Sequence, residues 1–396
     1  MAKAIGKEEE GGEVMKILYC IPHLYNSGGM ERVLTQKVNW LITHTAHEII
    51  IVTTELTPKG LSDTYFPLDK RVRVEAMHID FDADYHKPLF TKYRGHMRKM
   101  RQYRQLLEAF IQKHHIDLCI SLCGKEIAFL RQLPCRAIVE MHFAMNQRQQ
   151  LIEANHRGLF WSLIGRIRTR QLVRAVKPLE HVIVLTKKDQ CDWQQAGCKH
   201  VTVIPNPCSL DGQPIPPATL SSKTVLAVGR LHEQKGFDLL LHAWKAIESH
   251  HPKWELCIVG SGDQRSSLEV LIAELGLQQV VLAGRTKAIE NEYANASLFV
   301  LSSRYEGLPL ALIEAMWSGL PCVAFNCPQG PAELLADSRG WLVPNGDISA
   351  LANQIEHVIT HADEASLRAK KAQTYAQTTY SEEAIMPQWL KVINGK

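Results

Sequence analysis

Short apolar runs rich in β-branched residues alternate with longer amphipathic stretches from residue 16 onward. In the first half of the chain these runs are bounded by turn residues, as strands are. Their hydrophobicity is continuous rather than alternating, which indicates strands buried on both faces of a parallel sheet. The strands predicted here are KILYCI, HEIIIVTT, DLCISL, AIVEMHF and HVIVLT.

The same rhythm restarts after residues 201–223, VTVIPNPCSLDGQPIPPATLSSK. This segment is rich in Pro, Ser and Gly, and we interpret it as an interdomain linker. The strands predicted beyond it are TVLAVGRL, WELCIVGSG, QVVLAGRT, SLFVLSS, PCVAFN and GWLVP.

The two halves predict an α/β protein made of two doubly wound, Rossmann-like domains that face a central cleft. We expect an N-terminal domain over residues 15–206 and a second domain over residues 207–375. We expect residues 376–396 to form a last helix that crosses back to the first domain. The polar residues 1–14 are expected to be a disordered extension or an expression remnant.

Composition narrows the class further. A chain of 396 residues with 45% hydrophobic content is long enough for two hydrophobic cores, which agrees with two domains.

No apolar run approaches the roughly 20 residues that span a bilayer, and the start does not resemble a signal peptide, so we expect a cytosolic protein. The ten cysteines form no CxxC pair, which indicates reduced thiols. The net charge of +4 gives no global field for nucleic acid, and we expect no nucleic-acid partner.

The stretch SRYEGLPLALIEAM follows a predicted strand and carries two carboxylates, Glu306 and Glu314. Gly307 starts a turn, and Pro309 suits the first position of a helix. The loops after strands are where ligands of doubly wound sheets bind. We therefore expect this stretch to face the cleft.

The backbone N–H groups of Leu308 and Leu310 would lie at the start of that helix, where free donors and the helix dipole bind anions such as a diphosphate. Carboxylates beside a diphosphate would repel it, so we expect Glu306 and Glu314 to accept hydrogen bonds from sugar hydroxyls. The alternative is that one carboxylate caps the helix and the other is solvated.

Two cations follow the predicted strand TVLAV: Arg230 at its end and Lys235 five residues later. With the flexible Gly236 they suit a diphosphate, although a solvated turn is the alternative. Gly260 in VGSGDQRSSL opens a further helix. It favours a nucleotide domain, although the third glycine of the dinucleotide motif is missing.

Together GRLHEQKG, SRYEGLPLALIEAMWSGLPCVAFNCPQGPAEL and NSGGMERV resemble the motifs of retaining glycosyltransferases of family 4, which have the GT-B fold. The resemblance extends from residue 15 to the C-terminus and implies that residues 15–206 form the acceptor-side domain and residues 207–375 the nucleotide-sugar-binding domain. It implies that Arg230 and Lys235 bind the diphosphate of a nucleotide-sugar donor. It implies that Glu314 binds the ribose and Glu306 the transferred sugar.

The resemblance assigns further donor-binding residues. Backbone groups of Arg285 and Thr286 would hold the base, commonly uracil. Gly28 and Gly29 would let the backbone approach the donor phosphates or the acceptor, with an ordinary turn as the alternative. His142 ends the strand AIVEMHF and would lie near the transferred sugar, with a satisfied core histidine as the alternative.

Glu306, His142, Arg230 and Lys235 are thus the expected catalytic residues. Arg230, Lys235 and helix N–H groups could stabilise the leaving diphosphate without a metal or another cofactor. The resemblance implies retention by front-face displacement. Glu306 as a nucleophile in a double displacement is the alternative.

A competing metal motif occurs in HIDFDADYHK, where Asp80, Asp82 and Asp84 alternate. As a calcium loop it fails, because Tyr85 and Thr91 replace the required glycine and glutamate. We interpret it as a solvated acidic loop and expect no metal site.

Two stretches, residues 87–110 and 157–177, have the pattern of basic amphipathic helices, which lie on anionic membrane surfaces. A core-packed helix with a solvated basic face is the alternative. With CPQGPAEL, which resembles a subgroup that uses UDP-sugars in capsule, O-antigen or exopolysaccharide synthesis, they favour a lipid-diphosphate-linked saccharide acceptor at the inner membrane face. The apolar positions are Met97, Met100, Tyr103, Leu107 and Phe110 in the first and Phe160, Leu163, Ile164 and Ile167 in the second.

Two other functions remain open at this point. A sugar-nucleotide epimerase with the GT-B fold would release an epimerised product without an acceptor. A non-catalytic protein that binds sugar nucleotides could use the same fold.

Overall fold

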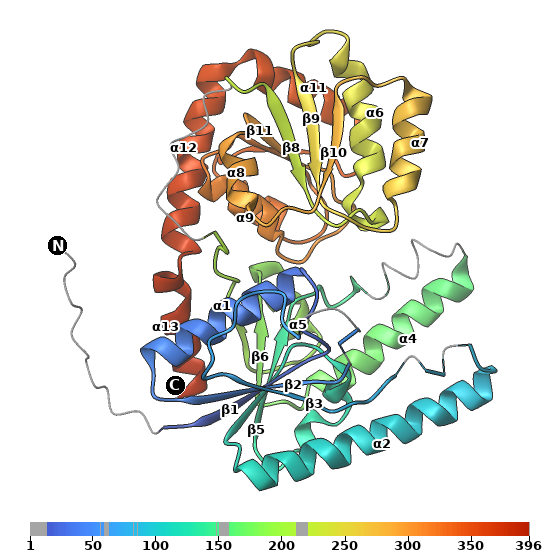
Figure 1. The fold of residues 1–396 in the computed structure, drawn as a ribbon, viewed down its shortest axis with the longest axis vertical. Helices are drawn as coiled ribbons and strands as arrows, with labels where there is room; N and C mark the ends of the chain where they lie inside the picture. The colour runs from blue at the N-terminus through green and yellow to red at the C-terminus, as the bar shows by residue number, and fades with distance from the viewer. Residues whose placement is uncertain are drawn as a thin grey trace, which may run out of the picture.

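The computed structural model describes residues 14–55, 57–58, 63–81, 83–84, 86–147, 149, 158–210 and 221–395. These residues form two α/β units that lie one above the other along the long axis of the molecule (Figure 1). The predicted N-terminal extension, apart from Val14, and residues 211–220 of the predicted linker lie outside the described residues.

The N-terminal domain is built on a seven-stranded sheet with the order β3-β2-β1-β4-β5-β6-β7, in which all neighbours pair in parallel. Its strands are β1 Lys16–Ile21, β2 Glu48–Thr53, β3 Arg73–Ala76, β4 Leu118–Ser121, β5 Arg136–Met141, β6 His181–Val184 and β7 Val201–Val203. Its helices are α1 Gly29–His44, α2 Leu89–His114, α4 Leu159–Val176 and α5 Lys187–Gln195, with 3-10 turns η1 Lys125–Ala128 and η2 Leu130–Gln132.

The C-terminal domain contains a six-stranded parallel sheet with the order β10-β9-β8-β11-β12-β13. Its strands are β8 Thr224–Val228, β9 Glu255–Val259, β10 Val280–Gly284, β11 Leu298–Leu301, β12 Cys322–Phe325 and β13 Trp341–Val343. Its helices are η3 Glu233–Lys235, α6 Phe237–Glu248, α7 Arg265–Leu275, α8 Ile289–Ala294, α9 Leu310–Trp317, α10 Pro331–Leu334, α11 Ile348–Thr360 and α12 Ala362–Thr379. The predicted class of two doubly wound parallel sheets is confirmed.

Two strands were not predicted from the pattern. The strand β3 is short, lies at the sheet edge and is exposed at both ends, so it has no continuous apolar run. The strand β7 occupies the first residues of the segment that we interpreted as a linker. It pairs with β6 and forms the edge of the sheet opposite to β3.

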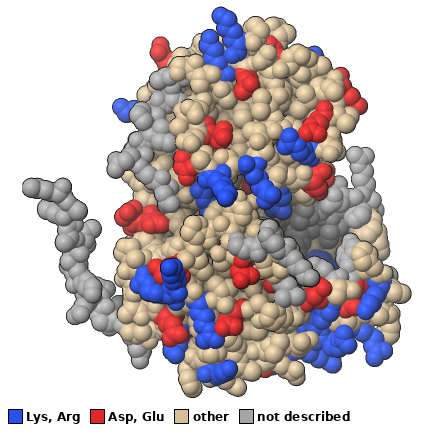
Figure 2. Space-filling model, in the orientation of Figure 1, with Lys and Arg blue, Asp and Glu red and all other residues tan. Residues whose placement is uncertain are grey.

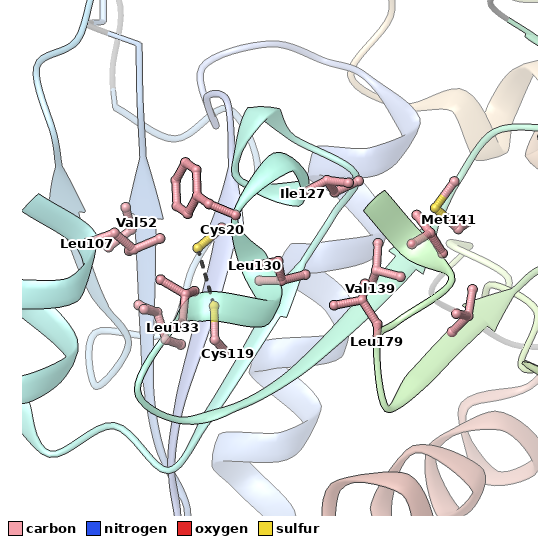
Figure 3. Close-up of a cluster of buried hydrophobic side chains, with 14 of the residues drawn as sticks. Cys20, Val52, Leu107, Cys119, Ile127, Leu130, Leu133, Val139, Met141 and Leu179 are labelled. Carbon is pink, nitrogen blue, oxygen red and sulfur yellow. Dashed lines mark hydrogen bonds between the residues drawn. The ribbon is translucent and has the colours of Figure 1, made fainter. Parts of the chain in front are cut away.

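Apolar side chains fill both faces of each sheet. Figure 3 shows one face of the N-terminal core, where Cys20 of β1 and Cys119 of β4 meet with their Sγ atoms 3.7 Å apart. These strands are neighbours, which explains the contact. Both cysteines are free thiols, as are the other eight of the chain.

The last helix, α13 Glu382–Ile393, belongs to the core of the N-terminal domain. Figure 1 shows α12 running down from the upper unit and α13 lying beside the lower one. Trp389 of α13 is 1% exposed and packs with the apolar residues of β1 and α1. Arg136 at the start of β5 donates to the carbonyls of Ile393 and Val392 at 2.8 and 3.0 Å, which ties the end of α13 to the sheet.

None of the helices within the described ranges is both long enough and apolar enough to cross a bilayer.

We expect Trp389→Ala to destabilise the protein by about 3–5 kcal/mol, because it leaves a large cavity between α13 and the N-terminal core. The urea midpoint measures this loss. The control is Leu367→Ala on α12, which is 57% exposed and should change stability by no more than about 0.5 kcal/mol. Equal midpoints for the two variants would contradict the packing role of α13.

Candidate functional site at the domain interface

Glu306 and Lys235 meet at the carboxyl ends of β8 and β11. The Lys235 Nζ lies 2.7 Å from Glu306 Oε1, and the Ser303 hydroxyl donates to the same oxygen at 2.6 Å. Glu306 is 7% exposed, so this carboxylate is held by defined partners rather than by solvent. The pair unites two residues that the sequence predicted as separate parts of one site.

The loop that carries Lys235 is fixed to the loop after β11 by several contacts. Arg304 forms a bidentate pair with Asp238, at 2.8 and 2.6 Å, and Gln234 donates to the Tyr305 carbonyl at 2.9 Å. The Arg304 charge outweighs the effect of burial and lowers the pKa of Asp238, so the pair stays ionised. These contacts hold the turn that carries Lys235 beside the loop that carries Glu306.

The helix α9 starts beside this pair. It begins at Leu310 with Pro309 as its N-cap, so the prediction that Pro309 occupies the first helical position was wrong by one residue. The proline N-cap leaves the first turn without a side-chain acceptor. Among the described residues none accepts a hydrogen bond from the backbone N–H of Leu308 or Leu310, so these donors remain for an anion.

Glu314 lies on α9 and is almost fully enclosed. The Tyr293 hydroxyl donates to its Oε2 at 2.8 Å, the Ser209 hydroxyl donates to its Oε1, and Arg32 Nη1 lies 3.3 Å from the same oxygen. Burial and the Glu314 charge raise the pKa of Tyr293 well above its usual range, so Tyr293 stays a neutral donor. Arg32 comes from α1, so this carboxylate bridges the two domains.

Arg230 lies two residues after β8 and is exposed. Among the described residues, none forms a hydrogen bond or an ion pair with its side chain. Gly260 follows β9 with φ of +150°. A Cβ built on Gly260 would lie 1.8 Å from the Gly229 carbonyl oxygen, so only glycine allows the loops after β8 and β9 to approach this closely.

Arg285 and Thr286 follow β10, the edge strand of the sheet, two positions away from β8. Arg285 is exposed, and the Thr286 hydroxyl accepts a hydrogen bond from the Ala288 N–H at 3.1 Å. No contact within the described residues joins either of them to Glu306 or Glu314.

The N-terminal domain contributes Gly28, Gly29 and His142. Gly28 caps α1, and a Cβ built on Gly29 would lie 3.0 Å from Leu310 Cδ1 of α9. A Cβ built on Gly307 would lie 2.8 Å from the His142 carbonyl oxygen. The loops after β1 and β5 therefore contact the start of α9 and the turn before it, which brings Gly29, His142, Gly307 and Leu310 together at one interface.

His142 follows β5, and its side chain is 4% exposed. Its Nε2 lies 3.2 Å from Oε1 of Glu140, which is itself paired with the buried Lys37. The alternative of a satisfied core histidine fits the burial of His142 but not its Nε2 atom, which has no hydrogen bond to a described residue, and the contact with the transferred sugar stays a prediction.

The predicted acidic loop before α2 is solvated at Asp80, which is exposed, but not at Asp84. Asp84 is 6% exposed and pairs with Lys87 at 2.6 Å and Lys99 at 2.8 Å. These two lysines neutralise it and tie the loop to α2. Asp82 and Tyr85 of the same motif lie outside the described residues.

Three residues that complete the site were not predicted from the sequence: Arg32, Ser209 and Tyr293. Arg32 lies in the motif NSGGMERV and could have been noticed there. Ser209 lies in the linker and Tyr293 on α8, positions without a local signal. They reach Glu314 only because the chain folds the linker and α8 against α9.

Residues 214–377 match the family model described as Glycosyl transferases group 1. An uncharacterized glycosyltransferase of Haemophilus influenzae is 26% identical over 388 residues, 96% of this chain and 99% of the relative. A Campylobacter jejuni α-1,4-N-acetyl-D-galactosaminyltransferase, named for a GalNAc-containing diNAcBac-PP-undecaprenol acceptor, is 25% identical over 96% of this chain and 98% of its own.

Solved glycosyltransferases share the fold of the whole chain. A point mutant of Staphylococcus aureus TarM in complex with fondaparinux, α-GlcNAc-glycerol and UDP superposes with a TM-score of 0.74 at 16% identity, over 96% of this chain and 100% of that one. Anabaena HepE in complex with UDP and glucose gives a TM-score of 0.71 at 19% identity, with the same coverage of both chains. The predicted GT-B fold is confirmed.

We expect Gly260→Ala to destabilise the C-terminal domain by about 1–3 kcal/mol more than Gly276→Ala, measured by urea denaturation. Both glycines have positive φ, but a Cβ on Gly276 meets nothing within 4 Å, whereas a Cβ on Gly260 meets the Gly229 carbonyl. Equal losses of stability would mean that the loops after β8 and β9 separate without cost.

Proposed function

We propose that this chain, a glycosyltransferase with a group 1 domain, transfers a hexose or N-acetylhexosamine from a UDP-sugar to a lipid-diphosphate-linked saccharide, with retention and without a metal. The contact that carries this proposal is the Lys235–Glu306 pair, 2.7 Å apart beside the open N-terminus of α9. It combines a cation for a leaving phosphate with a carboxylate for a sugar.

The donor diphosphate would lie between Arg230, Lys235 and the start of α9. The exposed Arg230, the Lys235 ammonium and the N–H groups of Leu308 and Leu310 supply positive charge and hydrogen-bond donors from two chain segments, the loops after β8 and β11. Negative charge grows on a leaving nucleoside diphosphate during transfer. Fixed donors aimed at that charge stabilise the transition state more than the ground state.

Glu306 and Glu314 would bind the two parts of the donor on either side of its diphosphate, the transferred sugar and the ribose. Glu306 beside Lys235 would accept from hydroxyls of the transferred sugar, and His142, whose carbonyl reaches the Gly307 turn, would approach the same sugar from the other domain. Glu314 would accept from the ribose hydroxyls. Because Arg32 and Tyr293 already contact Glu314, the ribose must share or displace the Arg32 contact.

Retention by a front-face displacement suits these partners better than a double displacement. Lys235 and Ser303 occupy one oxygen of Glu306, and both contacts lower the nucleophilicity of the carboxylate. In the front-face route the leaving phosphate assists deprotonation of the acceptor. Arg230 and Lys235 then act as electrostatic partners of that phosphate.

UDP as the nucleotide is supported by the structural neighbours, since TarM and HepE are both solved with UDP. Arg285 and Thr286 at the end of β10 would offer backbone groups to the base. Capsule, O-antigen or exopolysaccharide synthesis is supported by relatives such as the amylovoran glycosyltransferase AmsD of Erwinia amylovora, 36% identical over 43% of this chain.

A lipid-linked acceptor is supported by the N-terminal domain surface. The first turns of α2 and α4 expose large apolar side chains, with Phe90 71%, Tyr93 63% and Phe160 67% exposed. The C-terminal half of α2 is instead core-packed, since Tyr103 and Leu107 are buried. Leu172 and Val176 near the end of α4 are buried in the same core, so the core-packed alternative describes the C-terminal halves of both helices.

Exposed arginines border these apolar side chains. Figure 2 shows Lys and Arg gathered at the lower right, where α2 lies in Figure 1. Burial and the charges of Lys125 and Arg168 lower the pKa of His96, so the basic face of α4 lies near α2. Apolar tips beside cations are what an anionic membrane surface binds. The exposed arginines are Arg94, Arg98, Arg101, Arg166, Arg168, Arg170 and Arg174.

Calorimetric titration with UDP, GDP and their hexose conjugates tests the donor site. We expect UDP species to bind and Arg230→Ala to weaken binding about 10- to 100-fold, because a charged hydrogen bond to a phosphate is lost. Arg131→Ala, an exposed arginine of the N-terminal domain, is the control and should bind UDP as the wild type does.

The titration, together with an assay of sugar transfer and epimerisation, separates the alternatives. Binding of no nucleotide would overturn the proposed function. Sugar transfer to an acceptor that persists in EDTA supports metal-independent transfer, whereas epimerised product without an acceptor would identify an epimerase. Binding without turnover of any donor would favour a non-catalytic role.

We expect the protein to sediment with vesicles that contain anionic lipid and to lose most of this binding at high salt, because screening weakens surface charge attraction. Neutralising Arg98, Arg101, Arg166 and Arg170 should weaken binding by about 1 kcal/mol for each charge. Neutralising the exposed Lys245 and Lys253 of the C-terminal domain is the control. Binding that does not depend on salt would contradict the electrostatic account.

A further inference from the structure

A buried ion pair, Lys37–Glu140, lies beside His142. Glu140 is 1% exposed and contacts two groups: the Lys37 ammonium of α1, which is fully buried, and His142 Nε2 at 3.2 Å. The Nε2 atom has no well-directed hydrogen bond, so the Glu140 carboxylate acts on the imidazole through its charge. No other acid lies within ion-pair distance of His142 in the described part of the chain.

Glu140 and Lys37 form an ion pair although both are buried. Burial raises the pKa of Glu140, but its contacts with Lys37 and His142 outweigh burial and lower the pKa to about 2. An unpaired buried charge is strongly disfavoured, so Glu140 and Lys37 each require the other. Glu140 therefore presents a permanent negative charge to one side of the His142 ring.

The last helix of the chain completes this network. The Lys37 Nζ lies 3.8 Å from the centre of a Trp389 ring and 5.3 Å from that of Tyr19. Lysine above aromatic faces is attracted by their negative charge. Because Arg136 also ties α13 to the start of β5, the strand that carries Glu140 and His142 is held by α13 near both ends.

We propose that Glu140 is a positioning residue, held by Lys37 and Trp389, which fixes the His142 imidazole with a proton on Nε2 and leaves Nδ1 for the transferred sugar. The proposal rests on the proposed function in one respect, the contact of His142 with the sugar. A carboxylate beside one ring nitrogen favours a proton on that nitrogen, and the other nitrogen of the neutral ring is then an acceptor. The C-terminal helix is then part of the framework that orients the site.

Two double variants test this proposal with charge and volume nearly matched. Lys37→Met with Glu140→Gln removes both charges but keeps an acceptor near Nε2. Lys37→Met with Glu140→Leu removes both charges and the acceptor. Replacing a whole buried ion pair by neutral groups of similar size is often tolerated, so both proteins should fold, which thermal unfolding verifies.

The first measurement is the ¹⁵N NMR spectrum of histidine-labelled protein, in which His142 is assigned by its absence in His142→Asn. We expect a proton on Nε2 in the wild type, largely retained in the Gln variant and redistributed between the nitrogens in the Leu variant. His181, which contacts the Thr202 hydroxyl at 2.7 Å outside this network, should give an unchanged signal in all three proteins.

The second measurement is kcat beside the Kd for UDP. We expect the Leu variant to lose about 10- to 100-fold in kcat, as expected when a group at the reacting centre is misplaced, with UDP binding unchanged. The Gln variant should retain more activity than the Leu variant. Loss of stability with equal kcat in both variants would reduce Glu140 to a structural role.

An unchanged His142 signal in the Leu variant would overturn the proposal whatever the activity. If the wild type transfers no sugar, the proposed function fails, while the NMR comparison still decides whether Glu140 orients His142. A changed His142 signal with unchanged kcat would exclude a catalytic consequence and so overturn the positioning of a sugar contact.

Discussion

Parallel pairing in both sheets is the constraint on which the rest of this structure depends. It sends the carboxyl end of each strand to the same edge of its sheet, so the loops that carry Gly29, His142, Lys235 and Glu306 emerge together. Since the two edges face each other, the Gly307 turn touches the His142 carbonyl and Gly29 lies against Leu310. A site made from both domains follows from this arrangement rather than from any single motif.

The interface between the domains is held by polar contacts as well as by the chain itself. Arg32 donates to the Ser209 carbonyl at 2.7 Å and contacts Glu314, while Gln36, one turn later on α1, donates to the Cys208 carbonyl at 2.8 Å. One face of α1 thus binds both the linker and α9. Glu314, the residue expected to bind the ribose, is the partner of Arg32 in this interface. The same carboxylate would therefore take part in donor binding and in the contact between the domains.

The crossing of the chain back to its first domain joins distant parts of the molecule. The helix α12 packs its alanines on the C-terminal core, and α13 supplies Trp389 to the Lys37 ammonium. The linker is tied to the same crossing point, since the Cys208 N–H donates to the Tyr380 carbonyl at 2.7 Å. The helix α13 thus contacts both α1, through Lys37, and the start of β5, through Arg136.

The apolar runs of the chain were enough to predict the two parallel sheets, and its motifs predicted which loops would carry the candidate site. Buried parallel strands need continuous apolar runs, and anion-binding loops need glycine, cations and open helix starts, so both leave local patterns. The folded chain adds that Arg32, Ser209 and Tyr293 enclose Glu314, and that Lys37, Glu140 and Trp389 form one network beside His142. These partners lie far apart in the chain, and a buried charge selects its partner by proximity in space, which no local pattern records.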